Sequence, residues 1–134
     1  MTRRVAAAAL LLAAVACGHE SHEPGATREI EVKLRDSRFV PDHFEVEAGT
    51  TVRFVVENRD PIDHEFLIGD AEVQRAHEEG TEKHHGAKPG EISIPALETR
   101  TTTYTFDEPG TLLIGCHLPT HYAYGMKGDI TITE

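Results

Sequence analysis

Three side chains with affinity for soft metal ions recur at five-residue steps near the C-terminus: Cys116, His121 and Met126. A thiolate, an imidazole and a thioether form the ligand set that selects copper over harder metals. Copper in such a site usually takes two imidazoles, one thiolate and a long axial methionine. The second imidazole must therefore come from elsewhere in the chain, and His64, in Asp63-His64-Glu65-Phe66, is the best candidate.

Each of these residues has an ordinary explanation when it is taken alone. A lone cysteine is most often a small buried hydrophobe, and a lone methionine usually fills a gap in the core. Their combination in one loop favours the metal site. Met126 is the only methionine besides Met1, and Cys116 is the only cysteine outside the leader region. A glycine precedes each of the two, and Pro119 stiffens the loop between them.

Residues 115–126 resemble the ligand loop of the cupredoxins, the small blue copper proteins that include plastocyanin, azurin and rusticyanin. In bacterial members the loop commonly reads Cys-His-x-Pro-Gly-His-Tyr-x-x-Gly-Met, and this chain differs only at Thr120, where glycine is usual. The resemblance covers roughly residues 28–134. It implies one mononuclear type 1 copper site whose ligands are the Cys116 thiolate, the His64 and His121 imidazoles, and a weak axial Met126. Many members have Asn or Ser where Glu65 stands, so the usual hydrogen bonds between the two ligand segments cannot be carried over.

The rest of the chain must supply the scaffold for this loop. Apolar residues alternate with charged ones from Arg28 to Leu34 and again over residues 52–56, as in half-buried strands. Further strand-like segments follow at 39–46, 66–68, 91–95, 101–106, 112–115 and 129–133. Pro41 interrupts the first of these, which suits a bend or a sheet edge. Seven to eight short strands with regular turns predict an all-β sandwich. The cupredoxin resemblance implies the same fold, with Greek-key connections.

The segment 69–90 interrupts this pattern as an irregular excursion. Residues 71–79 could form a short helix, with Asp70 as N-cap and Gly80 just past its end. The excursion also carries a His- and Glu-rich cluster: His77, His84, His85, Glu78, Glu79 and Glu82. Two readings stay open, a second, looser metal site or a charge-rich surface. His117 follows Cys116 directly, so extended backbone would point its side chain away from the copper.

The N-terminus has the pattern of an exported protein. Residues 1–16 combine a short basic start with an apolar run too short to span a bilayer, which predicts a signal peptide. Ala14-Val15-Ala16 suits ordinary cleavage, but Cys17 at that point favours a bacterial lipobox with Cys17 lipidated. Residues 17–27 then read as a lipid-anchored or flexible tether, and 28–134 as one copper-binding domain. We therefore expect the protein in the periplasm or cell envelope.

Composition narrows the classes of function. A net charge of −10 argues against nucleic acid as a partner. No acid–base pair or substrate pocket can be read, and a Cys–His nucleophile would lack an orienting third group, so we expect no enzyme. We also expect a monomer.

Two functions stay open on the sequence. The first is one-electron transfer with a transient redox partner, which could dock at Leu118, Pro119, Tyr122 and Tyr124 if these do not merely shield the copper. The second is copper tolerance, storage or delivery, with a copper donor or acceptor as the partner. The complete blue-copper ligand set favours the first, and the His-rich excursion favours the second.

Overall fold

Alternating apolar residues form the inward faces of two packed sheets. The computed structural model describes residues 27–81 and 86–134. In strand β1 (Thr27–Leu34) the buried side chains are Ile30, Val32 and Leu34, and in β4 (Thr50–Asn58) Val52, Phe54 and Val56 are fully buried. Side chains two residues apart point to the same face of a strand, so each of these strands presents one apolar face to the core.

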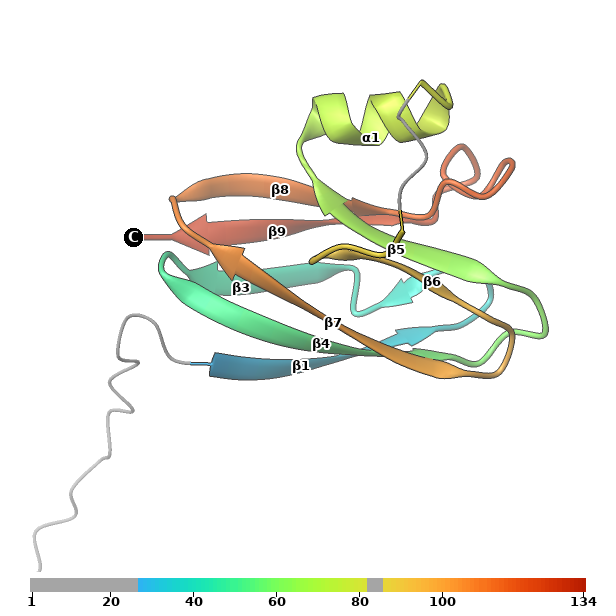
Figure 1. Ribbon diagram of the computed structural model, residues 1–134, viewed down its shortest axis with the longest axis horizontal. Coiled ribbons are helices and arrows are strands. Elements are labelled where there is room, and N and C mark those ends of the chain that lie inside the picture. The colour runs from blue at the N-terminus through green and yellow to red at the C-terminus, as the bar shows by residue number, and fades with distance from the viewer. Residues whose placement is uncertain (1–26, 82–85) are drawn as a thin grey trace, which may run out of the picture.

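The two sheets hold nine strands within the described residues (Figure 1). One sheet has the order β2-β1-β4-β7, with β2 at Phe39–Val40 and β7 at Thr99–Phe106. The other has the order β3-β9-β8-β5-β6, formed by His43–Glu47, Lys127–Thr133, Gly110–Gly115, His64–Gly69 and Glu91–Ile94. The predicted all-β sandwich is confirmed. The number of strands exceeds the expected seven to eight because β2, a two-residue strand, is counted separately.

The interruption of the 39–46 segment at Pro41 is confirmed, and it divides the segment into two strands. Its first part, β2, pairs antiparallel with β1, whereas its second part, β3, pairs parallel with β9 in the other sheet. Proline has no backbone N–H to donate to a ladder and is confined to sheet edges and bends. The chain therefore crosses from one sheet to the other at this point.

Five phenylalanines fill the space between the sheets. Phe54 lies 5.2 Å from Phe66, 5.9 Å from Phe44 and 6.4 Å from Phe106, measured between ring centroids. Phe39 packs edge-on against Phe66 at 5.8 Å. Such pairs contribute about 0.5–1.5 kcal/mol each beyond the burial of their area. Phe66 shares the inward face of β5 with His64, so the packing that fixes this ring also fixes the strand that carries the histidine.

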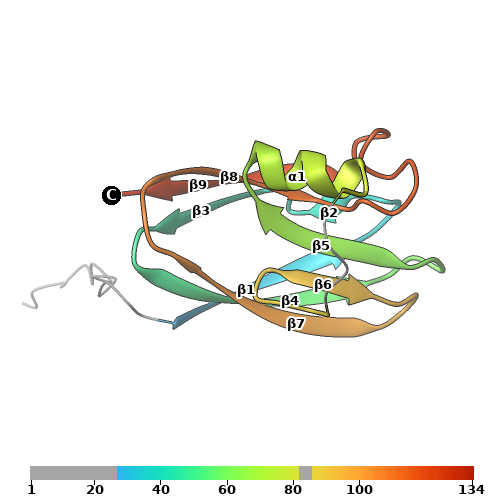
Figure 2. The ribbon, with the colours of Figure 1, turned by 45° about the horizontal axis from the view of Figure 1, so that its top comes forward.

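The predicted helix is confirmed as α1 (Ala71–Glu78), one residue shorter than expected. The Asp70 side chain accepts a hydrogen bond from the Val73 N–H at 2.9 Å, which caps the first turn. Gly80 follows the helix with a φ of 64°, a conformation that glycine adopts without penalty. Figure 2 shows α1 lying over β5 and β8, on the outer side of their sheet. Within the described part of the chain, no helix has the length and apolar character needed to cross a bilayer.

The two ends of the sandwich differ in what they carry. Thr27 and the C-terminus lie at one end, and the loop between β8 and β9 lies at the other (Figure 1). The expected signal segment 1–16, residues 17–26 of the expected tether, and Glu82, His84 and His85 of the His- and Glu-rich cluster lie outside the described residues.

Candidate metal centre

Two neighbouring strands bring the predicted ligands together. His64 is the first residue of β5, and Cys116 directly follows β8. These strands pair antiparallel, with Leu67 opposite Gly115, so Cys116 lies beside the start of β5. His121 belongs to the loop that leads from β8 to β9.

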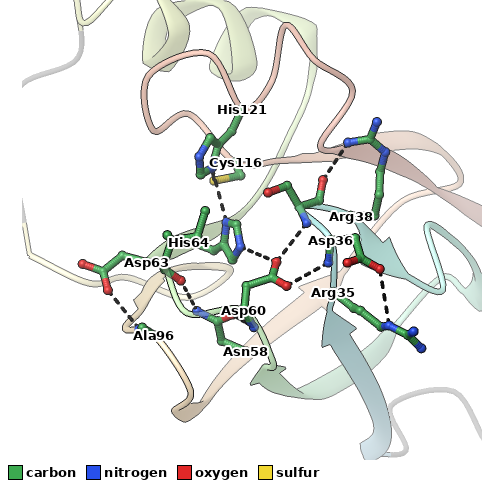
Figure 3. Close-up of polar contacts among 12 residues, drawn as sticks. Arg35, Asp36, Arg38, Asn58, Asp60, Asp63, His64, Ala96, Cys116 and His121 are labelled. Carbon is green, nitrogen blue, oxygen red and sulfur yellow. Dashed lines mark hydrogen bonds and ion pairs between the residues drawn. The ribbon is translucent and has the colours of Figure 1, made fainter.

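Three donor atoms converge at this point (Figure 3). His64 Nδ1 lies 3.3 Å from His121 Nδ1, and Cys116 Sγ lies 3.3 Å from the same His121 atom. All three atoms are within 4.8 Å of one another. His64 and Cys116 are fully buried, and His121 is half-buried.

The hydrogen bonding of His64 shows which nitrogen is free to bind a metal. Its Nε2 lies 2.8 Å from Asp60 Oδ2. A carboxylate only accepts hydrogen bonds, so Nε2 carries the proton and Nδ1 presents a lone pair toward Cys116 and His121. Two nitrogens bound about 2.0–2.1 Å from one tetrahedral ion, the distances known for zinc, would be about 3.3 Å apart. The observed spacing of the nitrogens therefore fits a single transition-metal ion, and the donor set of one thiol and two imidazoles fits copper.

The Cys116 thiol lies in surroundings that favour its neutral form when no metal is bound. Burial raises the pKa of Cys116, and the negative charges of Glu65 and Glu78 add to the increase. Backbone hydrogen bonds from Glu65, whose N–H lies 3.2 Å from the sulfur, and from Leu118 partly oppose it. Because metal coordination deprotonates a thiol outright, the ion would displace the Cys116 proton on binding.

His121 is held in the form that binds metals. Burial lowers the pKa of His121, and the neighbouring His64 lowers it further, against smaller opposite effects of Glu65 and Asp60. A neutral imidazole is the metal-ligating form of histidine. His121 therefore has its lone pair available at neutral pH.

The fourth predicted ligand, Met126, is fully buried and is bonded into the same loop. Its backbone N–H donates to the His121 carbonyl at 3.0 Å, and its carbonyl accepts from the Cys116 N–H at 3.2 Å. Thr120, at the position where cupredoxins usually have glycine, has a φ of 75°. Glycine enters this left-handed region at no steric cost, which explains the usual residue.

Glu65 joins the two ligand segments in place of the Asn or Ser found in many cupredoxins. Its backbone N–H donates to the Cys116 sulfur, and its Oε2 accepts from the His117 N–H at 3.3 Å. The link thus uses both the backbone and the side chain of one residue.

The His117 ring is directed to helix α1. Its Nδ1 lies 2.8 Å from Glu78 Oε2 and its Nε2 lies 2.7 Å from Gln74 Oε1. The ring also stacks on Tyr122, with 4.5 Å between the centroids. Gln74 is buried, and its Nε2 donates to the carbonyls of Leu67 and Leu113. The helix is therefore bonded to both ligand-bearing strands.

Two residues that support the centre were not anticipated from the sequence. Gln74 occupies the middle of a helix with a polar composition, where nothing marks it as buried. Asp60 lies in Asn58-Arg59-Asp60-Pro61, which reads only as a turn. A carboxylate four residues before a candidate histidine ligand is the one signal that could have pointed to it.

Only His77, Glu78 and Glu79 of the predicted second metal site lie within the described residues. His77 Nδ1 lies 3.1 Å from the Val73 carbonyl and its Nε2 lies 3.0 Å from Glu91 Oε1. Within residues 27–81 and 86–134, the group of His64, Cys116 and His121 is the only set of three His, Cys, Asp or Glu side chains that converges. His84 and His85 lie outside the described residues, so their part of the prediction is untested.

Comparison with known proteins agrees with this geometry. A family model described as a cupredoxin-like domain matches residues 6–132. The copper-resistant cuproprotein CopI of Pseudomonas aeruginosa is 29% identical, over 87% of this chain and 82% of that protein. Its namesake in Rubrivivax gelatinosus is 31% identical, over 80% of this chain and 67% of that protein. The reduced auracyanin of the photosynthetic bacterium Roseiflexus castenholzii superposes with a TM-score of 0.67 at 25% identity, covering 82% of this chain and all of that one.

Proposed function

Because this chain belongs to the cupredoxin-like domain family, we propose that it is a copper-binding protein of the bacterial cell envelope that serves copper tolerance. One copper ion would be held by His64, Cys116, His121 and Met126. The alternative of a general electron carrier ranks second.

The convergence of three donor atoms carries this proposal. His64 Nδ1, Cys116 Sγ and His121 Nδ1 meet in a largely buried pocket, and the Asp60 contact leaves the His64 lone pair facing the other two. Relatives named copper-resistant cuproproteins, similar over most of the chain, support tolerance as the role.

The chain's own residues would keep bound copper apart from water and from other reactants. A bound copper ion would supply a one-electron Cu(I)/Cu(II) couple. Cys116 and His64 are fully buried and His121 is half-buried, so these ligands have little contact with solvent. Asp60 orients the His64 ring, and Glu65 holds the Cys116 sulfur through its N–H. A protein that sequesters copper in this way prevents the free ion from cycling in solution.

One observation favours electron transfer as a second candidate. His64 Nδ1 and Cys116 Sγ each lie 3.3 Å from His121 Nδ1, a spacing that suits one bound ion, so little rearrangement would be needed when the charge of that ion changes. His121 is also the most exposed of the candidate ligands, and Tyr124, three residues further along the same loop, is 76% exposed. A redox partner could reach the centre there through a small interface.

Two experiments test the proposal. Copper(II) added to the purified protein should produce an intense visible thiolate-to-copper band that Cys116→Ser abolishes; wild-type protein without this band would contradict the site. A deletion strain should grow less well in excess copper, and the wild-type gene but not the Cys116→Ser gene should restore growth. If both genes restore growth equally, tolerance does not depend on this centre. Fast electron self-exchange with no copper phenotype would favour the second candidate.

We propose further that the protein is exported, lipidated at Cys17, monomeric and not an enzyme. The basic start and apolar run of residues 1–16 and the position of Cys17 support export and lipidation. Mass spectrometry of the protein from membranes should find a diacylglyceryl group on Cys17 that Cys17→Ala removes. A mature N-terminus other than Cys17 would contradict lipidation.

A further inference from the structure

We propose that Asp60 is a positioning residue of the metal centre, which presets the His64 ring for the ion and favours copper(II) over copper(I). The inference rests on the proposed copper site. It concerns a residue outside the ligand set whose carboxylate acts through His64.

The contact between the two side chains is close and shielded from water. Asp60 Oδ2 lies 2.8 Å from His64 Nε2, on the side of the ring opposite the donor atoms (Figure 3). His64 is 0% exposed and Asp60 is 8% exposed. A carboxylate that accepts from the far nitrogen of a ligating histidine fixes its tautomer and ring orientation and raises the basicity of the ligand.

Asp60 is itself held in place from several directions. Its Oδ1 accepts from the Asp36 N–H at 2.8 Å, and its Oδ2 accepts from the Ser37 N–H at 2.9 Å. Its own N–H donates to Asn58 Oδ1, and its carbonyl accepts from the Leu97 N–H. The carboxylate therefore cannot turn away from His64 without breaking contacts to a separate part of the chain.

The loop that binds this carboxylate has an unusual backbone. Asp36 and Ser37 form the two-residue turn between β1 and β2, closed by backbone hydrogen bonds between Arg35 and Arg38. Both central residues have a φ of 53°. Turns that need a positive φ at both positions normally have Asn-Gly or Gly-Gly there. Successive backbone N–H groups in a turn form a concave anion site. The Asp60 carboxylate fills that site, and a strained turn persists only where its surroundings fix it.

The charge of Asp60 distinguishes the two oxidation states of copper. With a Cys116 thiolate and an Asp60 carboxylate, the centre is neutral around a divalent ion and carries one negative charge around a monovalent ion. Charge imbalance costs more in a buried site, because the effective dielectric constant is low. Asp60 should therefore stabilise the divalent state more than the monovalent state.

Asp60→Asn tests the charge with little change of shape, since the amide oxygen can still accept from His64 Nε2. Asp63→Asn is the matched control, because Asp63 is exposed and its carboxylate accepts from the Ala96 N–H, whereas the His64 ring bonds Asp60. Loss of such a partner typically changes metal affinity 10–100-fold. We expect Asp60→Asn to lower the ratio of copper(II) to copper(I) affinity at least tenfold, a rise of about 59 mV in reduction potential. A folded Asp60→Asn protein whose potential shifts no more than that of Asp63→Asn would overturn the charge effect.

A second measurement needs neither copper nor a substituted protein. Nitrogen-15 NMR of the histidines in the metal-free wild-type protein should show His64 protonated on Nε2, with its proton shifted far downfield by the carboxylate. A proton on Nδ1 would overturn the positioning role even if copper binds. If the expected tautomer is found but copper(II) gives no thiolate band, the proposed function fails while the Asp60–His64 contact stands.

Discussion

The backbone N–H of Glu65 donates to the sulfur of Cys116 over 3.2 Å, so the strand that begins at His64 is bonded directly to the cysteine. A hydrogen bond to the sulfur limits its movement, and it would also stabilise the charge of a metal-bound thiolate. The two ligand segments, far apart in sequence, are thereby bonded to each other.

Proton release on copper binding follows from the Cys116 thiol. Burial holds the pKa of this thiol above its ordinary value of 9.0, so it is protonated between pH 7 and 9 and must lose one proton to bind. The pKa of His121 lies below its ordinary value of 6.5, so that ring adds no proton loss in this range. We expect the apparent copper(I) affinity, measured by anaerobic chelator competition, to rise about tenfold per pH unit between pH 7 and 9. An affinity independent of pH would contradict a protonated Cys116.

Acid sensitivity should trace partly to Asp60. Burial alone would raise the pKa of Asp60, but the hydrogen bonds from Ser37, His64 and Asp36 outweigh it and leave the pKa below its ordinary value of 3.8. The contribution to stability is therefore present above about pH 3.8 and is lost as the pH falls through the lower folded-state value. Urea unfolding of metal-free wild type and Asp60→Asn should show a stability difference that shrinks below pH 4. A difference constant from pH 7 to 3 would count against this account.

A side chain at position 115 should destabilise the fold. A Cβ at this position would lie 2.4 Å from Gln74 Oε1, 2.8 Å from Tyr122 Cε2 and 2.9 Å from His117 Nε2. Overpacking of this kind costs about 1–3 kcal/mol, so we expect Gly115→Ala to lower the free energy of unfolding by that amount. Gly86→Ala is the control, because none of the described residues would lie within 4 Å of a Cβ there, and it should change stability by less than about 0.5 kcal/mol. Equal effects of the two substitutions would show that the contacts around Gly115 yield easily.

Gln74 should stabilise the docked helix rather than the ligand set itself. Gln74→Met keeps a similar shape but removes the hydrogen bonds to Leu67, Leu113 and His117. We expect a loss of about 1–3 kcal/mol in denaturant unfolding, because buried polar groups lose their partners. The visible copper band should persist. Arg75→Ala, which removes only an exposed ion pair with Glu79, should cost less than about 1 kcal/mol.

The sequence was sufficient to predict most of the strands and the convergence of three of the four candidate ligands. Alternation predicted β1 and β4 because side-chain direction along a strand follows from local geometry. The structure brings His64, Cys116 and His121 together, and their assignment as copper ligands stays a prediction. The parallel pairing of β1 with β4 and of β3 with β9 was not predictable, since strand pairing depends on contacts between segments far apart in the chain.

The roles of Asp60 and Gln74 were hidden for the same reason. Asp60 acts through the N–H groups of Asp36 and Ser37, which precede it by more than twenty residues, and the turn they form lacks the usual glycine signal. Gln74 bonds Leu113, 39 residues further along. From the sequence alone, a polar residue in a turn or a helix is expected to be exposed to solvent, because its hydrogen-bond partners are distant in the chain.

Thr27 lies at the end of the sandwich remote from the β8–β9 loop, so an anchor on the preceding residues would attach to the end of the domain farther from the candidate metal centre. A lipid at Cys17 would hold the molecule by the opposite pole from His121. The half-buried His121 would then face away from the bilayer, where soluble periplasmic proteins could contact it without approaching the membrane.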